Sequence, residues 1–180
     1  MSVVTPFRKP SAPSKTKTSE LIEPHGGELN WLYADESERA SLDGFVKTAP
    51  RWSLSPRQLC DLELLLNGAF SPLTGFMNEA DYQSVCQDMR LKNGLLWPMP
   101  IVLDVETNFA ESINVGEKIV LCDAEGVPTA VLTIESKWKP SLRREAVQVY
   151  GSEDQNHPGV AHLLNKTYSV YIGGSVTGLQ

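Results

Sequence analysis

The stretch LSPRQLCDLELLLNGAFSPLTGFM, residues 54–77, carries the strongest local folding signals of the chain. The hydroxyl of Ser55, a proline after it and an amide at Gln58 form a capping box, and a proline at the first helical position loses no hydrogen bond. Leucines then recur at helical spacing until Asn67-Gly68 provides a stop. The stretch therefore predicts a helix that begins after Ser55, followed by a turn-rich apolar link.

A second helix is predicted just downstream, over residues 79–91. Asn78 is a suitable N-cap, and Tyr82, Val85 and Met89 share one helical face. The helix is expected to end at Asn93-Gly94.

After residue 94 the hydrophobic pattern changes from a helical period to a strand period. Short helices are expected within residues 35–45 and 160–165, and a short hairpin connection at 124–126. Strands are predicted at residues 98–105, 117–123, 128–136, 145–150 and 168–173. Short, closely spaced strands with two early helices predict an α+β, mainly β fold, either a small barrel or a sandwich.

Length and charge limit the possible functions. The 180 residues suffice for one domain with a core and a tail, and the formal net charge is −6. Residues 1–19 hold four basic side chains and no acid, which predicts a flexible basic tail. The remainder carries 12 bases against 22 acids, so nucleic-acid binding is not expected. No apolar run is long enough for a membrane span or a secretory signal, so the expected compartment is the cytoplasm, without a membrane partner.

Histidines and glycines offer only isolated candidate groups. The turn His25-Gly26-Gly27 could direct backbone N–H groups at an anion, but we expect a plain tight turn there. No carboxylate or cysteine completes a zinc site with His157 and His162, so we assign both a structural role. The glycine doublets at 26–27 and 173–174 belong to no known phosphate-binding signature.

Acidic, aromatic and thiol side chains add no site. We interpret the acidic pair Glu153-Asp154 as solvated rather than as a cation site, and the tryptophans as packing rather than as an RNA platform. The cysteines are expected to be buried small hydrophobes, two on helices and one on a strand. The residues in question are Trp31, Trp52, Trp97, Trp138, Cys60, Cys86 and Cys122. No catalytic, cofactor-binding or metal-binding residue is therefore assigned.

Several blocks together resemble the start of sulfate adenylyltransferase (ATP sulfurylase). They occur in the family's order over roughly residues 20–180. The blocks are PHGGEL at 24–29, LSPRQLCDLE at 54–63, GAFSPLTGFM at 68–77, WPMPIVLDV at 97–105, VYG at 149–151, HPGV at 157–160 and GGSV at 173–176.

The resemblance implies a PUA-like β-barrel over residues 20–172, with residues 173–180 starting the linker to a catalytic domain. The parent reaction converts ATP and sulfate to adenylyl sulfate and pyrophosphate, with magnesium. In that family a QxRNPxHxxH-type block and a later glycine-rich loop hold the substrates, and neither motif occurs here. The chain is therefore expected to be inactive alone and to pack on the catalytic domain, with possible homo-oligomer contacts.

Two alternatives stay open at this stage. A PUA-like fold is also compatible with a free-standing RNA-binding module, and the turn at residues 25–27 with a small anion-binding protein.

Overall fold

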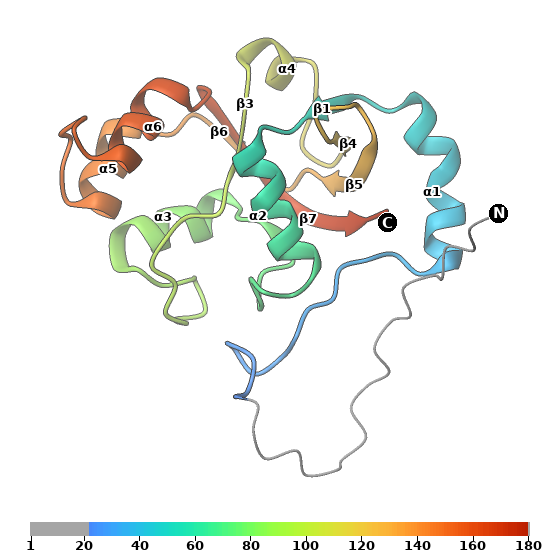
Figure 1. Cartoon of the computed structure of the whole chain (residues 1–180), viewed down its shortest axis with the longest axis horizontal. Helices are drawn as coiled ribbons and strands as arrows, with labels where there is room; N and C mark the ends of the chain where they lie inside the picture. Colours follow the sequence, from blue (N-terminus) through green and yellow to red (C-terminus); the bar gives the residue numbers. More distant parts are fainter. Residues whose placement is uncertain (1–21, 180) are drawn as a thin grey trace.

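The computed structural model describes residues 22–179, so the predicted basic tail at 1–19 lies outside the described residues. Its centre is a curled, mixed seven-stranded sheet, flanked by α5 and α6 at one end and by α1 at the other (Figure 1). The helices within the described residues are α1 (Glu36–Thr48), α2 (Pro56–Leu66), α3 (Glu79–Asp88), α4 (Thr107–Glu111), α5 (Leu142–Tyr150) and α6 (Pro158–Lys166). The strands there are β1 (Arg51–Ser53), β2 (Gly75–Phe76), β3 (Leu103–Val105), β4 (Lys118–Cys122), β5 (Pro128–Thr133), β6 (Ser136–Trp138) and β7 (Val170–Gly178).

The helix predicted after Ser55 is confirmed as α2. Ser55 Oγ accepts from the backbone N–H of Gln58 at 3.3 Å, and Gln58 Oε1 accepts from the N–H of Ser55 at 3.0 Å. The leucines on its inner face are buried in the main core. A second capping box begins α1, within the region where a helix was expected. The carboxylates of Asp35 and Glu38 each accept from the backbone N–H of the other residue.

The second predicted helix is confirmed as α3, but its predicted C-terminus is wrong. Asn78 caps it as expected, yet the helix ends at Asp88 because Met89 adopts a left-handed conformation with φ 52°. Met89 is therefore exposed rather than on the buried face. Asn93-Gly94 instead lies in a turn between residues 90 and 96, which form an isolated bridge.

The largest error in the predicted elements concerns residues 145–150, which form most of helix α5 instead of a strand. Their alternating pattern is short enough to fit either period. The decisive local signals flank it, since Ser141 caps the first turn and Gly151 takes the left-handed C-terminal position with φ 71°. Helix α4 was not predicted, and of residues 98–105 only β3 is a strand.

Strand β7 is the hub of the sheet. It pairs antiparallel with β2, β3, β5 and β6, whereas β1 joins the sheet through a parallel pairing with β4. The β4–β5 hairpin is formed as expected. Residues 173–178, which we expected to begin a linker, continue β7, so the predicted boundary at residue 172 falls inside the sheet.

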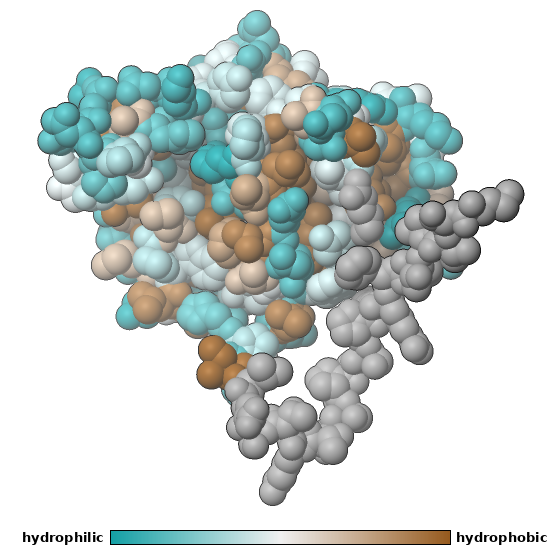
Figure 2. All heavy atoms as spheres, in the orientation of Figure 1, coloured by the Kyte–Doolittle hydropathy of each residue, from teal (hydrophilic) through white to brown (hydrophobic). Residues whose placement is uncertain are grey.

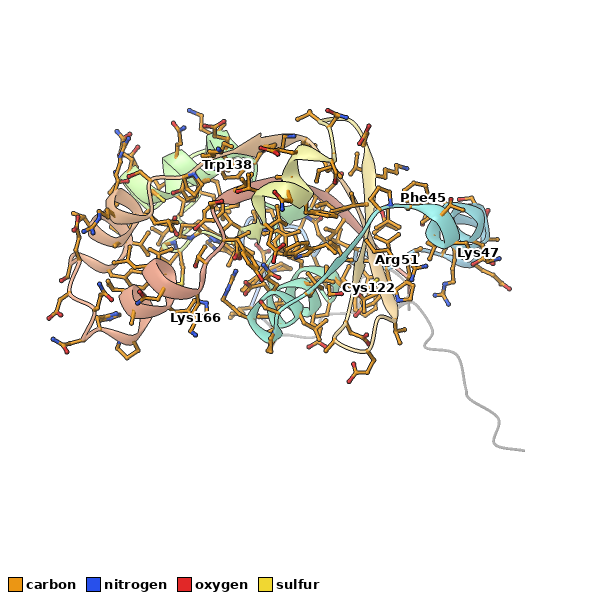
Figure 3. The ribbon with its side chains drawn as sticks, turned by 90° about the horizontal axis from the view of Figure 1, so that it is seen from above. Phe45, Lys47, Arg51, Cys122, Trp138 and Lys166 are labelled. Atoms are coloured by element: carbon orange, nitrogen blue, oxygen red, sulfur yellow. The ribbon has the colours of Figure 1, made fainter. Side chains whose placement is uncertain are left out.

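A small second apolar cluster fixes α1. Phe45 and neighbouring apolar residues of α1 pack on Val120, Cys122 and Val131 of the sheet. Figure 3 shows Phe45 and Cys122 at the same end of the molecule, far from Trp138. No helix within residues 22–179 combines the length and the apolar character that crossing a bilayer requires.

Replacing Gly173 tests the crowding around β7. A Cβ on Gly173 would lie 1.9 Å from the carbonyl oxygen of Met77. Gly173 lies within β7, and Met77 directly follows β2 and donates its backbone N–H to the carbonyl of Ile101. Gly173→Ala should therefore lower the free energy of unfolding by about 3 kcal/mol or prevent folding, because overpacked sites relax poorly. Urea unfolding followed by circular dichroism measures this change.

The matched control makes the same chemical change in open space. Gly44 lies within α1 and a Cβ there meets nothing within 4 Å. Gly44→Ala should raise the stability by about 0.5–1 kcal/mol through helix propensity. A Gly173→Ala protein as stable as the parent would contradict the role assigned to this glycine.

Candidate functional site

A buried carboxylate, Asp104 of β3, organises the polar contacts beneath α2. Its Oδ1 accepts from Arg57 Nη2 at 2.6 Å and from Gln58 Nε2 at 2.8 Å. Its Oδ2 accepts from the backbone N–H of Tyr168 at 2.8 Å, and Arg57 also pairs with Asp61 at 2.7 Å. One guanidinium is thus shared by two carboxylates, which ties α2 to β3 and to the chain entering β7.

A second buried carboxyl, Glu145 of α5, lies close to this network. Its Oε2 accepts from the hydroxyls of Tyr82 at 2.9 Å and Tyr171 at 3.0 Å. Burial raises the pKa of Glu145 above its ordinary value, and the two tyrosine hydroxyls only partly oppose that shift. Burial, and after it the Glu145 carboxylate, also raises the pKa of both tyrosine hydroxyls. The three side chains join α3, α5 and β7 through one carboxyl.

A hollow near these carboxyls has a volume of about 330 Å³ and is here called the Arg57 pocket. Its walls come from α2, α5, α6 and residues 99–102, and most of them are apolar. The polar groups that reach it are Arg57, Asp61, Glu145, Tyr150, His162 and Tyr171. Because Arg57 is already held by two carboxylates, the pocket offers no free cation for a triphosphate.

The three histidines have different environments in the structure. His25 Nε2 lies 2.7 Å from the carbonyl oxygen of Leu96, and its ring packs against Trp97. The turn itself is closed by the Gly27 N–H on the carbonyl of Pro24, which supports a tight turn. His157 caps α6 through Nδ1, while His162 is exposed at the edge of the Arg57 pocket.

The acidic pair at 153–154 makes local contacts. Glu153 pairs with Arg143 at 3.0 Å, and Asp154 accepts from the backbone and side chain of Asn156. Among residues 22–179, no group of three or more His, Cys, Asp or Glu is arranged to hold a metal ion. These contacts give the pair a structural explanation.

The tryptophans and cysteines behave mainly as packing residues. Trp52, Trp97 and Trp138 are buried, and Cys86 and Cys122 are buried thiols, with burial raising the pKa of Cys86 to about 12. The expectation that Cys60 is buried is wrong, because its place on α2 faces solvent. The glycine doublet at 173–174 serves close backbone packing in β7.

The two buried carboxyls were not singled out by the sequence. A signal existed for Asp104, since a lone carboxylate inside the apolar run WPMPIVLDV is rarely buried unless it is paired. No comparable signal marked Glu145, because its segment was interpreted as a strand. Its partners lie 63 and 26 residues away in the sequence.

Comparison with known proteins gives the class of this fold. Residues 22–180 match the family model described as the PUA-like domain, and the chain belongs to that family. The expected PUA-like fold is therefore confirmed, and residues 22–179 contain helices α4 and α5 in addition to the expected ones.

The relatives point to one kind of longer protein. The chain is 48% identical over 170 residues to a sulfate adenylyltransferase from Debaryomyces hansenii, covering 87% of this chain and 32% of the relative. It is 44% identical over 165 residues to the sulfate adenylyltransferase of Saccharomyces cerevisiae, covering 87% and 31%. The chain thus spans about a third of the length of these curated relatives.

A solved structure extends this comparison. The hexameric APS kinase from Thiobacillus denitrificans superposes with a TM-score of 0.68 at 31% identity, over 88% of this chain and 27% of that one. A probable bifunctional SAT/APS kinase from Sorangium cellulosum is 42% identical over 160 residues, covering 89% of this chain and 27% of the relative. In each case the similarity covers nearly all of this chain and a minor part of the other.

Replacing Glu145 tests the effect of its burial on stability. Because the pKa of Glu145 is raised in the folded state, that state binds a proton more tightly than the unfolded chain does. The stability of the parent relative to Glu145→Gln should therefore fall as pH rises above about 4.3, the ordinary value for a glutamate, and level off above the folded-state pKa. Urea unfolding of both proteins between about pH 4 and 8 measures the difference.

Glu153→Gln is the matched control for the change of net charge, because Glu153 lies on the surface. The parent could instead become more stable relative to Glu145→Gln as pH rises over the same range. That result would show that burial does not dominate the pKa of Glu145.

Proposed function

We propose that this chain is the N-terminal structural domain of a sulfate adenylyltransferase and makes no adenylyl sulfate by itself. The observation that carries the proposal is the coverage. Between 87% and 89% of the chain matches several such enzymes, while they extend about three times as far. A domain of this kind contributes a folded surface rather than reacting groups.

The described side chains support a non-catalytic role. Formation of adenylyl sulfate needs cationic and backbone donors that converge on the phosphates of ATP and hold sulfate in line with the α-phosphorus. Arg57 and Arg143 are each held by carboxylates of this domain. ATP and magnesium are accordingly assigned to the catalytic domain of the longer enzyme, which is the expected partner of this one.

The proposal extends to the assembly and the compartment of the longer enzyme. A hexameric relative shares this fold, so contacts between copies of the longer enzyme are a natural second task for the domain. The expected compartment is the cytoplasm, where the sulfur-assimilating reaction would take place. The acidic charge outside the first 19 residues does not favour the RNA-binding alternative.

A chimera tests this proposal. Residues 22–180 would replace the matched third of the Saccharomyces cerevisiae enzyme, and pyrophosphate release from ATP, sulfate and magnesium would be measured. The chimera should turn over, whereas the chain alone should release no more pyrophosphate than a blank, because it lacks the phosphate-binding part. The yeast enzyme without its matched third is the control.

Two outcomes would overturn the proposal. Turnover by the chain alone would show that the domain carries chemistry. A folded, soluble chimera without activity, alongside an active parent enzyme, would show that this domain cannot support that catalytic domain.

A further inference from the structure

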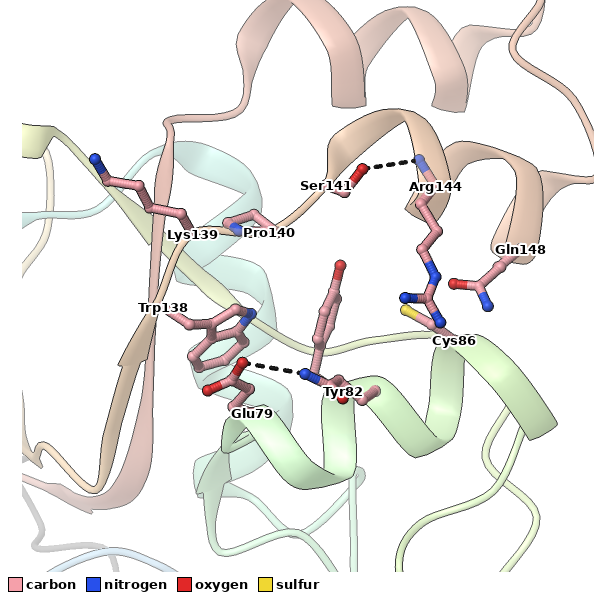
Figure 4. Close-up of a pocket in the computed structure, with 10 residues that line it drawn as sticks. Glu79, Tyr82, Cys86, Trp138, Lys139, Pro140, Ser141, Arg144 and Gln148 are labelled. Carbon is pink, nitrogen blue, oxygen red and sulfur yellow. Dashed lines mark hydrogen bonds between the residues drawn. The ribbon is translucent and has the colours of Figure 1, made fainter.

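A second hollow, here called the Trp138 pocket, lies on the other side of Tyr82 from the Arg57 pocket. It has a volume of about 210 Å³ and is formed by α3, the end of β6 and the first two turns of α5 (Figure 4). A single water occupies about 30 Å³ of liquid volume, so the hollow has room for a small solute.

Trp138 lines this hollow, and its indole N–H is an unpaired donor that the surrounding atoms shield from solvent. It is 8% exposed, and its indole Nε1 is the one buried side-chain nitrogen or oxygen within residues 22–179 that has no hydrogen-bond partner. The ring is held in place by Tyr82 and Tyr171, with centroids 5.4 and 5.7 Å away. Figure 4 shows the indole nitrogen on the ring edge that faces the space between Tyr82 and the start of α5.

An unpaired buried N–H destabilises a folded protein, so this donor indicates a place where a ligand or water can bind. Leaving such a group without a partner costs about 1–3 kcal/mol, so native structures seldom retain one without a bound water or ligand. The charged side chains of the hollow indicate which kind of ligand fits, because two of the three that line it are cations.

Two cations and one carboxylate line the hollow, so cations outnumber acids along its walls. Arg144 and Lys139 line it, and neither forms an ion pair with any residue between 22 and 179. The one acidic lining residue, Glu79, already accepts from the side chain of Gln83 at 3.1 Å. Figure 4 places the Arg144 guanidinium beside Gln148, across the hollow from Trp138, whereas Lys139 extends outward at the rim.

The position of the hollow in the fold adds to this field. It lies at the N-terminus of α5, a nine-residue helix capped by Ser141, where the helix dipole favours negative charge. Glu145 does not line the hollow, but it lies close to it: burial and, after burial, the Glu145 carboxylate raise the pKa of the Cys86 thiol in the hollow's wall. Gln83 and Lys139 at its walls are exposed, so ordinary side-chain rotation can widen the entrance.

We propose that the Trp138 pocket binds a small carboxylate anion, with the indole N–H of Trp138 and the guanidinium of Arg144 as its two principal donors. One carboxylate oxygen would accept from the indole N–H and the other would face Arg144. In this sheltered place each hydrogen bond is stronger than in bulk water. The site is independent of the proposed structural role, since it lies within this domain alone.

Indole N–H resonances provide a direct test in the full chain. The chain has four tryptophans, and Trp138→Phe identifies the Trp138 signal in a ¹H–¹⁵N spectrum while keeping an aromatic ring in place. Titration with malonate at constant ionic strength should shift that one signal downfield and saturate. Acetate should act in the same way but more weakly, and chloride should leave it in place.

A pair of neighbouring arginines supplies the matched variants. Arg144→Gln should weaken malonate binding at least about tenfold, the loss of one charge-assisted hydrogen bond. Arg143→Gln should leave it unchanged, because Arg143 faces Glu153 on the outer side of α5. Equal chemical shifts of the other three indoles in the parent and in both variants would show that all of them are folded.

Three outcomes would overturn the proposal. A Trp138 signal that does not move with malonate would assign the hollow to ordered water alone. Equal binding by Arg144→Gln and the parent, or an equal loss in Arg143→Gln, would place any bound anion elsewhere. Pyrophosphate release is not part of this test, so its result is separate from that of the chimera.

Discussion

The close approach of backbones around β7 is the constraint on which the rest of this fold depends. A Cβ on Gly173 would lie 1.9 Å from the Met77 carbonyl oxygen, one on Gly174 equally close to that of Thr133, and one on Gly75 2.0 Å from that of Gly174. Only residues without a side chain allow three chain segments to meet at such distances. Because β2, β3, β5 and β6 all pair with β7, the sheet closes around this point.

The buried carboxyls attach the helices to that strand. Glu145 joins α5 and α3 to Tyr171 of β7, and Asp104 joins α2 to the chain just before it. Buried polar groups of this kind are stable only when they are satisfied, so each one restricts how the helices can sit. The Arg57 and Trp138 pockets lie on either side of the Glu145 cluster, and their shapes therefore depend on it.

The glycine doublet at 173–174 shows how a motif can be misjudged without its neighbours. The family resemblance implied that a linker starts at residue 173, yet these glycines lie within β7, where other backbone segments approach them closely. The neighbouring groups also decide the interpretation of the turn His25-Gly26-Gly27, which was considered as an anion site. That turn is explained by its own hydrogen bonds, whereas the one buried side-chain donor without a partner in residues 22–179 is the indole N–H of Trp138.

The sequence by itself determined the local elements and the family. The capping box at residues 55–58 and the hairpin at 124–126 depend on residues a few positions apart, where side chain and backbone interact directly. The family resemblance depends on short sequence blocks and their order along the chain. It did not reveal that residues 145–150 are helical, because a six-residue alternation fits both periods. Only the tertiary structure decided the hub role of β7, the partners of Asp104 and Glu145, and the hollow at Trp138. Those features join groups tens of residues apart, such as Tyr82 and Glu145, and the folded chain alone brings them within hydrogen-bonding distance.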